Sequence, residues 1–130
     1  MIGIDIVKIS RIAEAMEKEK FCDKILNDIE INYANGKSKI VTKYGFDSVA
    51  MTVAGLFAAK EAVLKALGVG MRGGFGFKDI TIDHDEKGAP VVVLNNEIKT
   101  YMKKNKIKCK QMLVSIAHDG EYATAIAQMI

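Results

Sequence analysis

The sequence predicts a single α+β domain in which one strand and several helices precede a set of mostly antiparallel strands. Short β-branched segments lie at the N-terminus and in the last third of the chain, and a long apolar segment with helical spacing lies between them. The later strands follow one another through tight turns, which favours antiparallel pairing over repeated strand–helix–strand units. At 130 residues the chain suffices for one domain with its own core.

The first elements follow from alternation and spacing. Residues 2–9 are rich in isoleucine and predict a strand, whose alternating isoleucines share one face while Asp5 points to the other. Ser10 is then expected to cap a helix over residues 11–20, and a second short helix is expected over residues 21–26.

The middle of the chain is dominated by one long helix. Residues 27–48 contain two glycine breaks and predict short helices. The long helix is expected over residues 49–67, where apolar side chains recur at helical spacing. Asp47 or Ser48 caps its start, and the glycines from Gly68 onward end it.

The last third of the chain predicts two pairs of strands separated by a helix. Turn residues join the strands of each pair, which is typical of hairpins. We expect strands at 78–84 and 89–94, a helix at 95–105, and strands at 110–117 and 121–129.

Composition excludes several classes of protein. Hydrophobic residues make up 49% and charged residues 27% of the chain, which is typical of a folded domain rather than a disordered one. No apolar segment approaches the length of a membrane span, and the N-terminus carries an acid at once instead of the basic start of a signal peptide. Two isolated cysteines fit a reducing compartment. We therefore expect a cytoplasmic protein that is not bound to a membrane.

The charge balance indicates the chemistry of the partners. The net charge is +3, and only two of the 19 basic residues are arginine. A mild positive charge suits an acidic protein or a phosphate ligand. Proteins that recognise nucleic acid usually carry more arginine, so we expect no nucleic-acid partner.

The central helix carries the most informative side chains. Lys60 falls in the middle of the apolar stripe. Its ammonium therefore needs a buried partner, or its side chain must extend past the apolar residues so that the charge reaches solvent. Glu61 and Lys65 lie one turn apart on a flank that is otherwise alanine, which leaves room for a large ligand. The alternative is an ordinary surface ion pair of one helical turn.

The remaining candidates concern phosphate and metal binding. The glycine loop that begins at Gly68 formally matches G-x-G-x-x-G, but it follows a helix instead of opening one, so a dinucleotide fold is excluded. Its backbone amides could cradle a phosphate, or the loop is only a connector. With two histidines in the chain, only a hard divalent ion held by carboxylates is plausible, with Asp5 as first ligand and Glu61 as second. His118 lies at the end of a predicted strand. It is either a structural residue or a residue at the rim of a site.

Two long segments resemble the motifs of one family. Residues 3–12, Gly-Ile-Asp-Ile-Val-Lys-Ile-Ser-Arg-Ile, resemble the opening motif of the holo-[acyl-carrier-protein] synthases, the small 4′-phosphopantetheinyl transferases. Residues 57–68, Phe-Ala-Ala-Lys-Glu-Ala-Val-Leu-Lys-Ala-Leu-Gly, resemble their second motif. The glycine loop and three shorter segments follow in the family's order: 78–80, 88–90 and 114–118. The resemblance covers nearly the whole chain except residues 27–53.

The resemblance implies a fold and an activity. The fold would be that of the 4′-phosphopantetheinyl transferases, with a mostly antiparallel sheet and a long central helix, assembled as a homotrimer whose active sites lie at subunit interfaces. The reaction would move the 4′-phosphopantetheine group of coenzyme A to a serine of apo acyl carrier protein, with Mg²⁺, releasing adenosine 3′,5′-bisphosphate. It would serve fatty acid biosynthesis.

The resemblance also implies roles for individual residues. Asp5 and Glu61 would hold Mg²⁺, and the catalytic residues would be Glu61 and Lys65. Lys65 would reach the pyrophosphate as a point charge, and Glu61 would take the serine proton directly or through a metal-bound water. Coenzyme A would contact Lys60, Lys65, Gly68, Gly70 and His118. The carrier protein would dock on Arg11, Lys18 and Lys24, the first two sharing one face of a helix.

One departure from the family pattern is clear, and two other classes of function compete. Members often carry an arginine four residues before the Lys-Glu pair, where this chain has Leu56. A binding module could keep the fold and hold coenzyme A without transferring it. A binder of acidic proteins could use the carboxylates structurally. A mass increase of apo carrier protein by one phosphopantetheine arm would distinguish the enzyme from both.

Overall fold

The computed structural model describes residues 1–18, 20–36, 40–69 and 75–130. Within these ranges five strands form two sheets, which confirms the predicted α+β class with antiparallel pairing. The larger sheet has three strands in the order β1-β5-β4, and a hairpin of β2 and β3 forms the smaller one. The strands are β1 (Ile2–Lys8), β2 (Ile80–His84), β3 (Pro90–Leu94), β4 (Met112–Asp119) and β5 (Tyr122–Met129).

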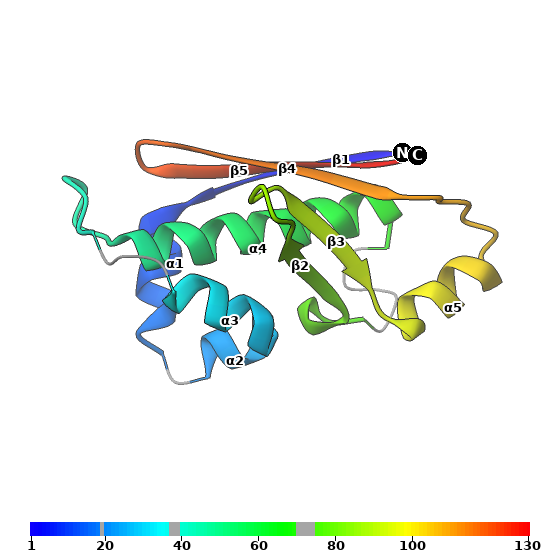
Figure 1. Ribbon diagram of the computed structural model, residues 1–130, viewed down its shortest axis with the longest axis horizontal. Coiled ribbons are helices and arrows are strands. Elements are labelled where there is room, and N and C mark those ends of the chain that lie inside the picture. The colour runs from blue at the N-terminus through cyan, green and yellow to red at the C-terminus, as the bar shows by residue number, and fades with distance from the viewer. Residues whose placement is uncertain (19, 37–39, 70–74) are drawn as a thin grey trace.

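The helices lie on one side of the larger sheet. Figure 1 shows the long helix α4 running along the sheet, with the shorter helices and the β2–β3 hairpin beyond it. The helices are α1 (Ile9–Met16), α2 (Phe21–Ile25), α3 (Asp28–Asn35), α4 (Ser48–Leu67) and α5 (Asn96–Lys104), with a 3₁₀ turn, η2, at Phe77–Asp79. No helix within the described ranges is long and apolar enough to cross a membrane.

Helix α4 is bounded as the sequence predicts. The carboxylate of Asp47 accepts a hydrogen bond from the Ala50 amide at 2.9 Å, which satisfies one of the free donors at the start of the helix. Gly68 ends the helix with φ of 75°, a left-handed conformation that glycine adopts without steric cost. The helix is buried on most sides because it lies between the sheet and the shorter helices.

Strand β1 lies unusually close to α4. A Cβ atom at Gly3 would lie 2.1 Å from the Ala62 carbonyl oxygen and 2.6 Å from the Ala66 amide nitrogen. The α4 residues on this side are small and fully buried alanines. Glycine on the strand and alanine on the helix thus allow the two backbones to touch, which brings the side chains that flank this contact together.

The isoleucines of β1 face away from the core. Ile2, Ile4 and Ile6 are 62%, 64% and 66% exposed, while Gly3 between them is buried against α4. Leu113 and Ile126 are also exposed on the larger sheet. Alternation along a strand places the apolar set on one face, and this chain leaves that face uncovered.

Helix α1 begins earlier than the sequence predicts. It starts at Ile9, directly after β1, so Ser10 lies in the first turn, and the capping position belongs to Lys8 without a side-chain hydrogen bond. The Ile9 amide donates to the Glu121 carbonyl at 2.8 Å, and the Ile9 side chain is fully buried. Tertiary contacts, not a capping side chain, therefore set the start of this helix.

Candidate active site

Asp5 and Glu61 meet at one cavity, as predicted. Asp5 comes from the middle of β1 and Glu61 from α4, and both line a cavity of 370 Å³. Arg11 of α1 lines the same cavity, and Phe21 and Phe57 add apolar walls. The close contact of β1 with α4 at Gly3 is what allows the two carboxylates to share this space.

Lys65 belongs to the same cluster. Its Nζ donates to Asp5 Oδ1 at 3.0 Å and to the Ile4 carbonyl at 3.0 Å. The Lys65 side chain is 51% exposed and that of Asp5 15% exposed, so the ammonium lies at the surface. It can therefore turn towards an incoming anion at little cost, since such an exposed pair is weak.

The electrostatics of the cluster favour a bound cation. Burial raises the pKa of the Glu61 carboxyl, the charge of Asp5 raises it further, and Lys65 opposes the shift. Two carboxylates that repel each other are stabilised by a divalent ion placed between them. In the described parts of the chain no three metal-binding side chains cluster.

The structure places Lys60 away from this cluster. Its side chain is 0% exposed, and its Nζ pairs with Glu30 Oε1 at 2.6 Å and donates to the Ile25 carbonyl. Burial lowers the pKa of Lys60, and Glu30 opposes that shift. Lys60 lines neither cavity described here. The expectation that it contacts coenzyme A is therefore wrong, whereas its need for a buried partner is confirmed.

A second cavity, of 480 Å³, surrounds His118 at the end of β4. Its walls come from α3, α4, the β2–β3 hairpin and β4. The lining residues that matter below are Tyr33, Gly55, Leu56, His84, Pro90 and His118. Leu56, where the family often has arginine, is buried and contributes an apolar surface here.

Gly55 makes room for His118. A Cβ atom at Gly55 would lie 2.9 Å from His118 Nε2 and 3.0 Å from Ile116 Cγ2. Nε2 lies 2.9 Å from the Met51 carbonyl oxygen. A carbonyl oxygen only accepts, so Nε2 is the donor of this hydrogen bond and Nδ1 takes no part in it. His118 is thus fixed in orientation with its second nitrogen available.

The two cavities lie at opposite edges of the larger sheet. Asp5 is on β1 and His118 on β4, with β5 between them. Helix α4 separates them as well, since its residues Gly55 and Leu56 face one cavity and Glu61 faces the other.

The glycines that were predicted to bind coenzyme A are only partly described. Gly68 ends α4, with its amide directed at the Leu64 and Lys65 carbonyls. This helix-ending role explains the residue without a ligand, and its contact with coenzyme A stays a prediction. Gly70 lies outside the described residues.

The predicted carrier-binding residues are exposed but not all on one helix. Arg11 is on α1 and Lys24 on α2. Helix α1 ends at Met16, and the four residues that follow it, 17–20, are all charged. Lys18 therefore lies beyond the helix, and the predicted shared face with Arg11 is wrong.

The comparisons with known proteins agree with this arrangement. Residues 1–127 match the family model described as the 4′-phosphopantetheinyl transferase superfamily. The chain is thus a member of the 4′-phosphopantetheinyl transferase superfamily, a class of group-transfer enzymes.

Its named relatives specify the kind of transferase. The chain is 43% identical over 129 residues to a holo-[acyl-carrier-protein] synthase of Clostridium kluyveri, covering 98% of this chain and 87% of that one. It is 43% identical over 125 residues to that of Campylobacter hominis, covering 95% and 91%. The chain is thus an enzyme of the holo-[acyl-carrier-protein] synthase kind.

Solved structures show the same fold. The Helicobacter pylori holo-[acyl-carrier-protein] synthase in complex with coenzyme A is 34% identical, with a TM-score of 0.80 and 100% of both chains covered. The Chronobacterium ammoniagenes synthase in complex with coenzyme A is 26% identical, with a TM-score of 0.81, covering 98% of this chain and 93% of that one.

Sequence reasoning missed three residues, one in the core and two at the cavity around His118. Glu30 is the partner of Lys60, and Tyr33 and His84 form part of the wall around His118. One signal was present for Glu30, because an acid three residues after Asn27 is typical of a capping box. No pattern in the sequence indicates that Tyr33 and His84 meet.

Proposed function

We propose that this chain transfers the 4′-phosphopantetheine group of coenzyme A to a serine of apo acyl carrier protein, with Mg²⁺, and thereby serves fatty acid biosynthesis. The observation that carries the proposal is the Asp5–Glu61–Lys65 cluster at a cavity open to solvent. Paired carboxylates and one mobile ammonium are the groups that neutralise and orient a pyrophosphate.

Each residue has a defined part in the reaction. Asp5 and Glu61 would hold Mg²⁺, which when bound supplies positive charge at the pyrophosphate. Lys65 leaves Asp5 and pairs with a phosphate oxygen. The serine oxygen forms a bond to the β-phosphorus while the bond from that phosphorus to the bridging oxygen breaks, and adenosine 3′,5′-bisphosphate leaves.

Glu61 is the proposed acceptor of the serine proton, directly or through a water. Burial and the charge of Asp5 raise the pKa of the Glu61 carboxyl, and a cation bound beside it would oppose that shift. Its position beside Asp5 and at the cavity surface places it where a serine could approach.

The second cavity supports a coenzyme A site shared between subunits. The neighbours crystallised with coenzyme A have the same fold as this chain. In one chain, His118 and the acidic cluster lie at opposite sheet edges with α4 between. A ligand that uses both therefore needs His118 from one subunit and Asp5 and Glu61 from another.

A homotrimer follows from this requirement and from the uncovered apolar face. Ile2, Ile4, Ile6, Leu113 and Ile126 are all at least 40% exposed. Contiguous exposed apolar surface marks interfaces between chains. Sedimentation should therefore give a mass of three 14.2-kDa chains at micromolar concentration, and a monomer would refute an interface-built site.

The carrier protein is proposed to dock beside the acidic cavity. Arg11 lines this cavity, and Lys18 and Lys24 follow it along the chain at exposed positions. An acidic partner would be steered to these charges and would arrive with its serine next to Glu61.

The direct test is the mass of the carrier protein. Apo acyl carrier protein, coenzyme A and Mg²⁺ are incubated with the enzyme, and the product is weighed by mass spectrometry. The expected result is an increase by one phosphopantetheine arm that disappears with a chelator. Tight binding of coenzyme A without any mass change would favour a binding module instead.

A further inference from the structure

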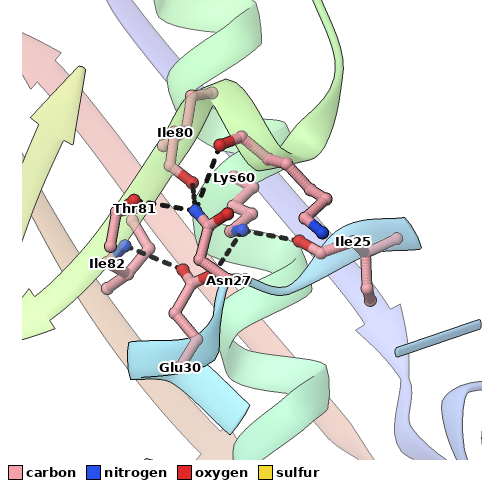
Figure 2. Close-up of polar contacts among 8 residues, drawn as sticks. Ile25, Asn27, Glu30, Lys60, Ile80, Thr81 and Ile82 are labelled. Atoms are coloured by element: carbon pink, nitrogen blue, oxygen red, sulfur yellow. Dashed lines mark hydrogen bonds and ion pairs between the residues drawn. The ribbon is translucent and has the colours of Figure 1, made fainter. Parts of the chain in front are cut away.

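The side chain of Glu30 connects three elements in the interior of the protein. Its Oε1 accepts from Lys60 Nζ at 2.6 Å, and its Oε2 accepts from the Ile82 amide of β2 at 2.8 Å. Its Oε1 also accepts from the Asn27 amide at 2.7 Å. Figure 2 shows Lys60 of α4, Glu30 of α3 and Ile82 of β2 joined in this way.

Helix α3 contacts β2 at regular steps. Asn27, at the start of α3, donates to Thr81 Oγ1 at 2.7 Å and lies within 3.3 Å of the Ile80 carbonyl (Figure 2). Three residues further along, Glu30 reaches Ile82. After three more residues, Tyr33 stacks on His84. Steps of three along a helix keep to one face, so one face of α3 follows β2 from its first residue to its last.

The last of these contacts forms part of the cavity around His118. The Tyr33 and His84 rings lie 3.7 Å apart between centroids and 8° from parallel. Both rings line the 480 Å³ cavity, together with side chains of α4 and β4. The position of this aromatic wall therefore depends on how α3 is held against β2 and α4.

Stability alone does not explain a charged pair at this place. Lys60 and Glu30 are both 0% exposed. Replacing such a pair with uncharged groups of similar shape is often neutral or stabilising, because removing two charges from water is costly. What the pair adds is orientation, since Glu30 joins α3 to Lys60 of α4 with one oxygen and to Ile82 of β2 with the other.

We propose that Glu30 is a positioning residue: through Lys60 and Ile82 it holds Tyr33 and His84 where they form a wall of the coenzyme A site. The proposal rests on the proposed function, in which this cavity takes coenzyme A. Glu30 contacts no substrate itself, and Lys60 acts only as its partner.

The test is the double variant Glu30→Gln with Lys60→Met, which removes both charges and keeps the size of both side chains. Either change alone leaves an uncompensated group in the core, so the single variants are not informative. Glutamine has one acceptor oxygen where the carboxylate has two, so either the Asn27 or the Ile82 amide loses its acceptor and the double variant should melt somewhat below the unmodified protein while still folding. The KM for coenzyme A should rise by about tenfold or more with kcat little changed, since binding and not chemistry is affected. Lys103→Met, an exposed change on α5, is the matched control.

Two further measurements separate positioning from a general structural effect. His84→Ala removes the wall, so in that background the double variant should change the KM no further. The chain has two histidines, so the ring protons of His84 can be followed by NMR with His118 as an internal reference. In the double variant the His84 protons should lose the ring-current shift that the stacked Tyr33 produces.

The outcomes distinguish this inference from the proposed function. A double variant with an unchanged KM and an unchanged His84 shift, in a protein that turns over coenzyme A, would overturn the positioning role and leave the proposed function standing. Absence of any coenzyme A turnover in the unmodified protein would overturn both.

Discussion

Gly3→Ala tests whether the contact between β1 and α4 builds the active site. The added Cβ would lie 2.1 Å from the Ala62 carbonyl oxygen, where ordinary contacts begin at 3.4 Å. Both atoms belong to backbone or are rigidly attached to it, so the strand must move away from the helix by about 1 Å. Crowding of this kind costs about 1–3 kcal/mol, which corresponds to a fall in Tm of about 4–12 °C for a chain of this size.

The same movement should impair the reaction more than it impairs folding. Asp5 moves with β1 while Glu61 stays on α4, so the two carboxylates separate. A misplacement of about 1 Å can cost on the order of 100-fold in rate. Thermal unfolding and the initial rate of carrier modification at saturating Mg²⁺ measure both effects.

Gly76→Ala is the matched control for this prediction. Gly76 has nothing within 4 Å of its Cβ position, and its φ of −110° suits alanine. The Gly76→Ala protein should therefore have the Tm and the transfer rate of the unmodified protein. A Gly3→Ala protein that behaves like this control would refute the close packing of β1 on α4 and the argument that this packing brings Asp5 to Glu61.

Three further predictions address single side chains. Glu61→Gln should lower the transfer rate by about 10²–10⁴-fold. Yet Glu61→Gln should raise the Tm at neutral pH without Mg²⁺. Burial and Asp5 raise the pKa of the Glu61 carboxyl in the folded state, so its contribution to stability is present below its unfolded pKa and is lost as the pH rises through its folded pKa. Glutamine stays neutral and avoids this loss; a lower Tm would contradict the prediction. Gly55→Ala should displace His118, whose Nε2 lies 2.9 Å from the added Cβ position, and should raise the KM for coenzyme A; unchanged NMR signals of His118 would count against it. Lys18→Glu should raise the KM for the carrier protein alone, with a difference that shrinks in high salt; a salt-independent difference would place docking elsewhere.

Local patterns determined most of the elements. The alternation in residues 2–9, the helical spacing before Gly68 and the Asp47 cap each depend on neighbours within a few residues, and the structure confirms them. The start of α1 was predicted wrongly, because the contact of Ile9 with Glu121 joins residues more than a hundred positions apart. No pattern within one segment reports such a contact.

The acidic cluster was predictable for a chemical reason. An acid within an apolar strand and an acid on an alanine flank are both unusual, and carboxylates in such places indicate a ligand. Asp5 and Glu61 could therefore be chosen from the sequence, and the structure brings them to one cavity. Lys60 could not be assigned in the same way. The sequence indicates that it needs a partner, but the partner is Glu30, 30 residues away on another helix.

The sequence by itself determined the α+β class, the long central helix, the family and the pair of carboxylates, since each of these depends on residue type and short-range spacing. Only the tertiary structure decided that the isoleucines of β1 face outward, that Lys60 turns into the core, and that Tyr33 and His84 share a wall with His118. These depend on which surfaces pack together. Gly3 of β1 packs closely against the alanines of α4, about 60 residues further along the chain. The free energy of such packing arises between segments that are distant in the sequence, so no local pattern reveals it.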